Sequence, residues 1–143
     1  MPTMKSLFFT LIAGMFLATL SLSAPDENKA PSTSPGNRIF EMRTYHTNDG
    51  KLEALHSRFR DHTNGLFVKY GITLVGYWVP EGKDNTLVYI LAYPSMDARK
   101  KSWKAFGSDP AWRKAYKASI ADGKLVNKVD SQFLRATDYS PIQ

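Results

Sequence analysis

The stretch Thr86-Leu87-Val88-Tyr89-Ile90-Leu91-Ala92-Tyr93 decides the fold, because as a β-strand it is apolar on both faces. Side chains of a strand alternate between its faces, which puts Leu87, Tyr89, Leu91 and Tyr93 on one face and Val88, Ile90 and Ala92 on the other. A sheet with two apolar faces is normally covered on both. Helices can cover one face, and the chain offers no further element for the other. We therefore expect a homodimer built sheet against sheet.

The elements before this strand are predicted from turn-forming residues and from the spacing of apolar side chains. Residues 72–79 are rich in β-branched and aromatic side chains, and the turn-forming stretch 80–85 joins them to 86–93 as a hairpin. Further upstream, a period-two pattern predicts a strand over 38–45. Helical spacing then predicts one long helix over 51–70, which Gly71 caps so that Ile72 folds back on Phe67.

The elements after the hairpin complete the topology. Ser95 caps a predicted helix over 96–106, Gly107 breaks it, and Asp109 with Pro110 starts a second helix that ends at residue 120. A last strand is expected over 124–135. The resulting order, βαββαβ, predicts an α+β fold of the ferredoxin-like type, in which helices cover one face of an antiparallel four-stranded sheet.

The N-terminal residues have the composition of an export signal. Lys5 precedes an uncharged apolar run over 7–20, and Ser21-Leu22-Ser23 offers small residues to a signal peptidase. We expect a signal peptide over 1–23 that is cleaved after Ser23, and an uncleaved membrane anchor is the alternative. Residues 24–37 are polar and rich in Pro and Ser, which predicts a flexible tether before a domain over 38–143.

Length, charge and cysteine content limit the classes of protein to consider. The 143 residues suit one domain, carry a formal net charge of +6 and include no cysteine. A lipoprotein anchor and disulfide bonds are therefore excluded. We expect an exported protein, either periplasmic or secreted, and no nucleic-acid partner, because the sequence shows no recognition module and the signal directs the chain away from the cytosol.

Four stretches of the sequence, in order, resemble the NIPSNAP family. They are Ile39-Phe40-Glu41-Met42-Arg43-Thr44-Tyr45 with Gly50-Lys51-Leu52, Lys69-Tyr70-Gly71 with Leu74-Val75-Gly76-Tyr77-Trp78, Ala92-Tyr93-Pro94-Ser95-Met96-Asp97-Ala98-Arg99, and Ser108-Asp109-Pro110-Ala111-Trp112. The resemblance implies a dimeric α/β-barrel and carries over no agreed reaction or catalytic residue. It links members to membrane-associated and mitochondrial roles, and the export signal of this chain argues against a mitochondrial one.

The residue types that usually carry catalysis are sparse. The chain has no cysteine and no G-x-S-x-G turn, which disfavours nucleophilic hydrolases, and no glycine-rich phosphate loop. The three histidines have no zinc-helix spacing. We therefore expect no metal and no cofactor. His62 lies between Phe59 and Leu66 on the predicted buried stripe, where it is either an acid or base in a helix–sheet pocket or a core histidine bonded to a carbonyl.

A charged face of the first strand supplies the candidate ligand-binding residues. Glu41, Arg43 and Tyr45 share the face opposite Phe40 and Met42. If Phe40 and Met42 pack on the helices, the charged residues point toward the dimer partner and form a buried ion pair, with Arg135 as a candidate partner. The alternative is an anion or carboxylate clamp built on Arg43. The full set of ligand-binding candidates is Arg43, Glu41, His62, Trp78 and Tyr45.

The basic excess of the chain concentrates between residues 95 and 120. Only Asp97 and Asp109 oppose a set of seven basic residues, which is Arg99, Lys100, Lys101, Lys104, Arg113, Lys114 and Lys117. Such a localised charge attracts anionic lipid headgroups or acidic partners, and the alternative is an ordinary solvated helix face.

These observations favour a binding protein and leave the question of catalysis open. We expect an exported, dimeric α/β-barrel protein that acts as a small-molecule or surface binding module. The alternative is a cofactor-independent monooxygenase or isomerase that acts on a small aromatic or lipophilic substrate in a helix–sheet pocket, an analogy with other dimeric α/β-barrels. A purely structural dimer is a third possibility.

Overall fold

The computed structural model describes residues 38–143. The predicted signal peptide over 1–23 and the predicted tether over 24–37 lie outside these residues. The described elements are, in order, β1 (Ile39–Thr47), α1 (Leu52–Arg58), η1 (Phe59–Thr63), α2 (Asn64–Lys69), β2 (Thr73–Trp78), β3 (Thr86–Tyr93), α3 (Met96–Ser108), α4 (Pro110–Ser119) and β4 (Val126–Leu134). The predicted βαββαβ order is confirmed.

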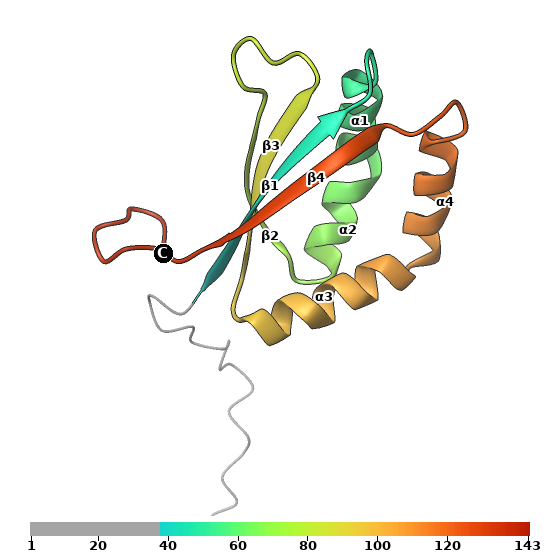
Figure 1. The fold of residues 1–143 in the computed structure, drawn as a ribbon. Coiled ribbons are helices and arrows are strands. Elements are labelled where there is room, and N and C mark those ends of the chain that lie inside the picture. The colour runs from blue at the N-terminus through green and yellow to red at the C-terminus, as the bar shows by residue number, and fades with distance from the viewer. Residues whose placement is uncertain (1–37) are drawn as a thin grey trace, which may run out of the picture. The chain divides into compact units, whose positions relative to one another are not determined.

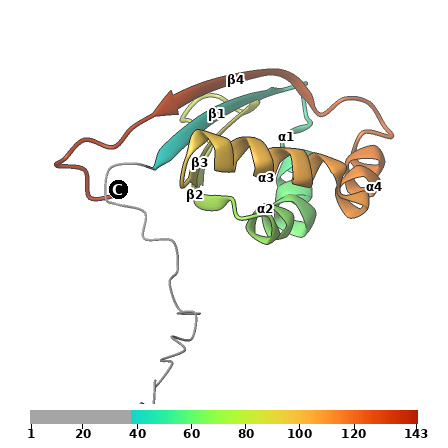
Figure 2. The same cartoon turned by 90° about the horizontal axis from the view of Figure 1, so that it is seen from below.

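The four strands form one antiparallel sheet in the order β2-β3-β1-β4 (Figure 1). β1 and β3 occupy the centre, where Glu41 lies opposite Leu91 and Tyr45 opposite Leu87. The helices lie on one side of this sheet (Figure 2), which leaves the other side open. The predicted ferredoxin-like α+β fold is therefore confirmed. Within the described residues no helix combines the length and the apolar composition that crossing a bilayer needs.

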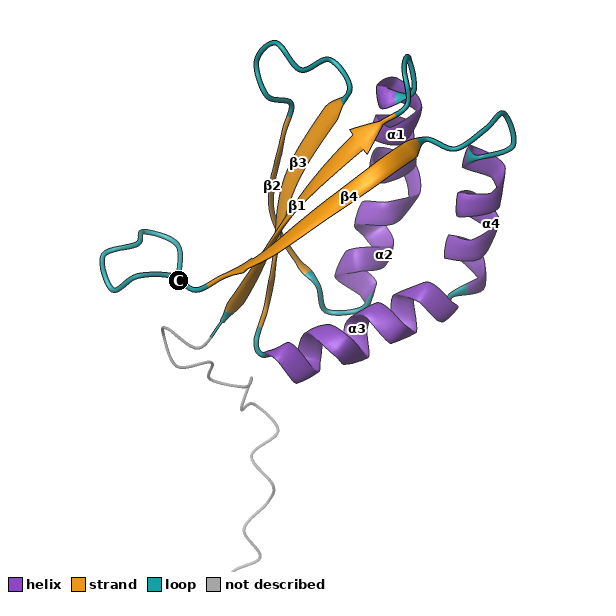
Figure 3. Cartoon of the chain, in the orientation of Figure 1, coloured by secondary structure: helices purple, strands orange, loops and turns teal. Residues whose placement is uncertain are grey.

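The long helix contains a wider turn that helical spacing did not predict. The run over 52–69 is continuous in space (Figure 3), but residues 59–63 form a π-helix, η1. A π-turn takes more residues per turn and rotates the residues after it about the helix axis. Arg58, Phe59 and Thr63 therefore face inward, while His62 is exposed. The prediction that His62 lies on the buried stripe is wrong, because it assumed an unbroken α-helical period.

The helix ends largely confirm the predicted caps. Gly71 has a φ of 73°, and its N–H and that of Ile72 donate to the carbonyls of Val68 and Phe67. Ser95 accepts a hydrogen bond from the backbone N–H of residue 98 at 3.1 Å. α3 continues through Gly107 to Ser108, so the predicted break lies two residues later.

Asp109 joins α4 to the C-terminal end of α2. Its Oδ1 caps α4 by accepting from the backbone N–H of Ala111 at 2.6 Å, and its Oδ2 accepts from Lys69 Nζ at 2.8 Å and from the Tyr70 hydroxyl at 2.6 Å. Asp109 is buried. Because α2 and α4 share this one carboxylate, the position of α4 relative to α2 is set by side chains as well as by the chain connection.

The face of β1 that meets the helices is the opposite of the predicted one. Glu41, which is fully buried, and Tyr45 contact the helix layer, and Phe40 and Met42 lie on the open face. The expected arrangement packs Phe40 and Met42 on the helices and directs the charged residues toward a dimer partner. It is wrong because Arg99 of α3 supplies a counter-charge inside the helix layer.

The open face of the sheet is apolar but is not bare along its whole length. Part of the segment after β4, residues 135–137, 140 and 142, lines a hollow of about 290 Å³ together with Phe40, Val75 and Ile90. Arg38 Nη1 also donates to the carbonyl oxygen of Gln143 at 3.0 Å. The expectation that no further element reaches this face is therefore wrong at one end. Elsewhere the face is accessible, and Trp78 is half exposed.

Candidate functional site

A cleft of about 270 Å³ lies between the helix layer and the outer part of the sheet. β4 is an edge strand, and its Val126, Asn127 and Val129 form one wall. Val129 of β4 is 41% exposed and Tyr116 of α4 is 44% exposed, which places both side chains at the mouth of the cleft. Seven of the described lining residues are aromatic: Tyr45, Phe59, Phe67, Trp103, Phe106, Trp112 and Tyr116.

The aromatic side chains pack on one another as well as around the cleft. Phe106 lies with its ring centroid 4.4 Å from that of Trp112 and 4.7 Å from that of Phe67, so it links α2, α3 and α4. Phe59 contacts Tyr45 across the helix–sheet boundary at 6.0 Å. These contacts hold the walls in place, and the cleft is therefore bounded by rigid rings from four helical segments and one strand, β1.

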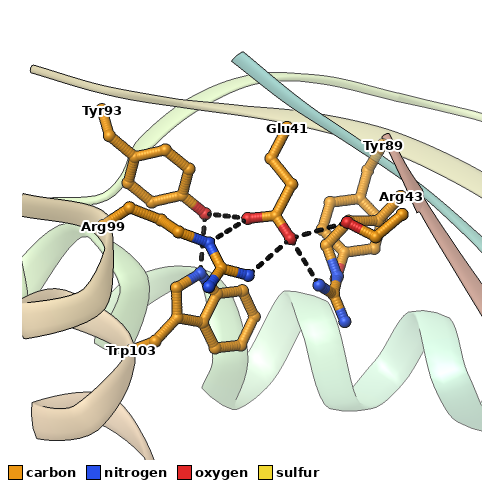
Figure 4. A network of polar contacts seen from close by, with 7 residues as sticks. Glu41, Arg43, Tyr89, Tyr93, Arg99 and Trp103 are labelled. Carbon is orange, nitrogen blue, oxygen red and sulfur yellow. Dashed lines mark hydrogen bonds and ion pairs between the residues drawn. The ribbon is translucent and has the colours of Figure 1, made fainter. Parts of the chain in front are cut away.

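A buried polar cluster centred on Glu41 (Figure 4) adjoins the cleft through Trp103, which also lines the cleft. Arg99 binds Glu41 in a bidentate manner, with Nε 2.9 Å from Oε2 and Nη2 2.8 Å from Oε1. Arg43 Nη1 donates to Oε1 at 2.6 Å, Ser131 Oγ to Oε1 at 2.9 Å, and the Tyr93 hydroxyl to Oε2 at 3.0 Å. We call these five residues, together with Tyr89 and Trp103, the Glu41 cluster.

The surroundings of Glu41 hold its carboxyl group ionised. Burial by itself raises the pKa of Glu41, but the hydrogen bonds from Arg99, Arg43 and Ser131 outweigh burial and lower the pKa from 4.5 to about 2. The predicted buried ion pair is thus present within one chain. Its partners are Arg43 and Arg99, and the predicted partner Arg135 takes no part.

The tyrosines and the tryptophan complete the cluster. Trp103 Nε1 donates to the Tyr93 hydroxyl at 2.8 Å, and Arg43 Nε donates to the Tyr89 hydroxyl at 2.9 Å. The Arg43 guanidinium also lies 4.9 Å from the centre of the Trp103 ring. Burial raises the pKa of both Tyr89 and Tyr93. The cluster is therefore internally satisfied and acts as a structural link between the sheet and α3.

Arg58 has a different environment, although it is also buried. Its residue surface is 6% exposed, and its guanidinium lies over the rings of Trp112 and Tyr116 at 5.7 and 5.3 Å. Nη1 donates to Ser119 Oγ at 3.2 Å, and the buried Nε has no hydrogen-bond partner among the described residues. Burial lowers the pKa of Arg58. Arg58 is the single charged residue among the described residues that line the cleft.

Sequence reasoning missed Arg58 although a signal was available. Arg58 comes three residues after Leu55, a spacing that places two side chains on one side of a helix. The prediction of the buried stripe gave that place to Phe59 alone. Both residues face inward because they come three and four residues after Leu55, before η1 widens the helix.

The structure separates the five predicted ligand-binding residues. Tyr45 lines the cleft, and Glu41 and Arg43 belong to the adjoining Glu41 cluster. His62 lines another hollow on the outer side of α1, next to residues 115, 118 and 119 of α4. Trp78 lies on the open face of the sheet, where its indole leaves no room for a Cβ at Gly76. The five residues therefore do not form one site.

The predicted basic surface is reduced by one residue. Arg99 is directed to Glu41 and is 23% exposed, so it belongs to the cluster. Lys100 pairs with Asp97 at 3.3 Å, and Arg113 Nε donates to the carbonyl oxygen of Gly107 at 3.3 Å. The remaining four residues are exposed: Lys101, Lys104, Lys114 and Lys117. Their attraction for anionic lipid headgroups stays a prediction.

The part of the chain that the structure describes contains no candidate metal site. Over residues 38–143 no three His, Asp or Glu side chains come together in a group that could hold a metal ion. The chemistry of the cleft therefore has to be argued from its arginine, its hydroxyl and amide groups, and its aromatic rings.

Comparisons with solved structures place the fold among known ones. A NIPSNAP family protein with unknown function from Agrobacterium tumefaciens is 24% identical, with a TM-score of 0.67 over 77% of this chain and 97% of that chain. An uncharacterized NIPSNAP domain protein from Burkholderia xenovorans is 26% identical, with a TM-score of 0.63 over 72% of this chain and 98% of that chain. Both share the fold described above.

More distant similarity reaches an enzyme. SnoaB, a cofactor-independent oxygenase from Streptomyces nogalater, is 17% identical, with a TM-score of 0.53 over 73% of this chain and 98% of that chain. At this identity the likeness shows the fold alone. None of the curated proteins matches this chain.

The family assignment rests on the domain as a whole. The family model described as NIPSNAP matches residues 40–141, which is nearly all of the described domain. The match contains the four stretches that resemble the family, apart from Ile39 at the start of the first. The chain therefore belongs to the NIPSNAP family.

Proposed function

We propose that this chain is an exported, homodimeric binding module that takes a small apolar molecule with an aromatic ring into the cleft between β4 and the helices. The observation that carries the proposal is the aromatic lining of this cleft, with Trp112 and Tyr116 on α4 and Tyr45 on β1. Ligand pockets are mostly apolar, with a few polar groups that orient the ligand. A volume of about 270 Å³ lies at the small end of such pockets and suits a molecule of one or two rings.

The polar groups of the cleft favour binding over catalysis. They are the Arg58 guanidinium, the hydroxyls of Tyr45, Thr63 and Tyr116, and the Asn127 amide. These groups hold and orient a ligand by hydrogen bonds. General acid–base catalysis uses a group that exchanges a proton near the working pH. His62, the sequence candidate for that role, lines a different hollow.

A neutral two-ring probe tests the proposal. We expect 2-naphthamide to quench the fluorescence of Trp103 and Trp112 in the wild-type protein as it enters the cleft. Val129→Phe places a larger side chain at the mouth of the cleft. We expect it to weaken binding about tenfold, because small changes in the size of an apolar pocket have effects of this order. The matched control is Val68→Phe, a change at a valine of α2 that is 62% exposed and outside the cleft.

Two results would contradict the proposal. One is a wild-type protein that does not bind 2-naphthamide. The other is equal binding by Val129→Phe and Val68→Phe, which would place the probe outside the cleft. A retained small molecule in native mass spectra of the purified protein would support the proposal directly.

The oxygenase or isomerase alternative uses the same cleft. Its support is the fold shared with SnoaB, which is support by analogy. Its oxygenase form predicts that 2-naphthol gains mass when it is incubated with the protein in air. Recovery of unchanged 2-naphthol after it has bound would leave the binding role in place and count against an oxygenase acting on such phenols.

The homodimer and the export belong to the same proposal and have a common test. The open sheet face, with Met42, Val88, Ile90 and the half-exposed Trp78, supports pairing with a second copy. Native mass spectrometry of protein recovered from the expressing cells reports both the oligomer mass and the loss of residues 1–23. A monomer that still carries these residues would contradict both parts.

A further inference from the structure

We infer that Arg58 anchors the ligand through a carboxylate, so that the cleft selects a small aromatic monocarboxylic acid over its neutral analogues. This inference rests on the binding role proposed above and adds the chemical class of the ligand. Its basis is a buried guanidinium that lines an apolar cleft without a carboxylate partner among residues 38–143.

Arg58 differs from the other arginines that lie between the helices and the sheet. Arg43 and Arg99 both bind the carboxylate of Glu41. In the described part of the chain, no Asp or Glu oxygen lies within ion-pair distance of Arg58. Asp61 lines an outer hollow together with Arg58 but forms no ion pair with it. Buried charges are normally paired, because an unpaired one loses its hydration without compensation.

The guanidinium of Arg58 has donors to spare. An arginine offers five N–H donors in a planar fork, and only the bond from Nη1 to Ser119 Oγ is formed with the described residues. Nε is buried without a partner. Although burial lowers the pKa of Arg58, an arginine stays protonated near neutral pH. The side chain therefore presents a permanent positive charge that a carboxylate can meet with two parallel hydrogen bonds.

The aromatic rings fix the direction from which such a ligand comes. Trp112 and Tyr116 lie against the guanidinium at 5.7 and 5.3 Å and keep it from turning freely. The remaining rings of the cleft offer flat apolar surfaces to the body of the ligand. Because Arg58 is the single charged residue in the described lining, one negative charge is neutralised and a second would be left unpaired. A monocarboxylate therefore fits better than a dicarboxylate.

The experiment compares two probes that differ in charge and have nearly the same shape. Binding of 2-naphthoate and of 2-naphthamide to the mature protein is measured by isothermal titration calorimetry. We expect 2-naphthoate to bind about ten- to a hundredfold more tightly than 2-naphthamide, because a charge-assisted hydrogen-bonded pair contributes a factor of this size to affinity. Arg58→Met removes the charge but keeps the volume, and it should abolish this preference by weakening the binding of 2-naphthoate far more than that of 2-naphthamide.

Two matched controls isolate the effect of position from that of net charge. Lys117→Met removes an exposed positive charge from α4, and Asp61→Asn removes the acidic neighbour in the outer hollow. Both should leave the preference for 2-naphthoate intact. A preference that disappears in Lys117→Met would assign it to the overall charge of the protein and overturn the anchor.

The outcomes separate the inference from the proposed function. If neither probe binds, the proposed cleft function fails and the inference fails with it. If both bind equally in the wild-type protein, the binding role stands and the carboxylate anchor is overturned. If Arg58→Met does not fold, the wild-type comparison decides by itself, and 2,6-naphthalenedicarboxylate, expected to bind more weakly than 2-naphthoate, provides the second measurement.

Discussion

Arg99 and Arg58 lie on different helices of one layer, both beside aromatic rings, yet one meets a carboxylate and the other does not. Arg99 forms two bonds to Glu41, which also binds Arg43, Tyr93 and Ser131. Arg58 has a serine hydroxyl and two aromatic rings. The first arrangement ties the sheet to α3. The second leaves a charge available to a ligand that enters the cleft.

This difference has a consequence for stability and function. A polar group with all its partners contributes to the fold, whereas a group without a partner costs free energy until a ligand supplies one. The Glu41 cluster should therefore be sensitive to substitution in stability measurements, and Arg58 should be sensitive in binding measurements. Three changes, with expected effects from large to small, test this division.

Glu41→Gln should destabilise the protein most. The substitution leaves Arg43 and Arg99 without their carboxylate, and breaking a buried ion pair from one side costs about 3–5 kcal/mol. Urea denaturation measures the change in the free energy of unfolding. Ser131→Ala, which removes one neutral donor to the same carboxylate, is the control and should cost about 1 kcal/mol. Equal losses of unfolding free energy in the two variants would contradict the prediction that Glu41 is central to the cluster.

Acid should destabilise the wild-type protein through the same carboxylate. The folded-state pKa of Glu41 is about 2, below its ordinary value of 4.5, so its contribution is complete above pH 4.5 and is lost as the pH falls toward 2. The shift corresponds to about 3 kcal/mol. Urea denaturation between pH 5 and pH 2 measures it. The pKa of Asp109 is also lowered, so the Glu41→Gln variant is needed as the reference. If its free energy of unfolding falls as steeply with pH as that of the wild-type protein, the loss does not come from Glu41.

Arg58→Met should have the smallest effect on stability. The substitution removes a buried charge that has no carboxylate partner among the described residues. Replacing such a charge by an apolar side chain of similar volume often leaves stability unchanged. We therefore expect the free energy of unfolding to change by no more than about 1 kcal/mol in either direction. Thermal and urea denaturation without ligand provide the measurement. Arg43→Met, which removes a bond to Glu41, is the comparison and should be less stable than Arg58→Met. The reverse order would show that Arg58 has a structural role.

The two arginines also show where sequence reasoning reached its limit. The charge pattern places Arg99 on the basic surface, and the apolar pattern gives no place to Arg58. Helical spacing identifies residues that share a side, and it does so under the assumption of a constant turn. Arg58 has ordinary helical spacing from Leu55, and it is missed because only apolar residues are counted toward a buried stripe. His62 is misplaced for a different reason, because η1 changes the turn after Arg58.

The position of Glu41 was misjudged for a different physical reason. The alternation in β1 correctly grouped Glu41 with Arg43 and Tyr45. Alternation does not say which of the two faces meets the helices, and placing Glu41 on the inner face carries the cost of burying a charge. That cost is offset by Arg99, which is 58 residues away in the chain. Only the packing of α3 against the sheet brings the two side chains together.

The sequence by itself determined the local features of this protein. The order of strands and helices and the caps at Gly71, Ser95 and Asp109 depend on residues within a few positions of one another, because a cap is made by a glycine backbone or by a side chain bonded to the next turn. The tertiary structure alone decided which face of β1 is buried, that Arg99 pairs with Glu41, and that Arg58 enters an aromatic cleft without a described carboxylate partner. The physical reason is that the free energy of a buried charge depends on its neighbours in space, and these come from distant parts of the chain.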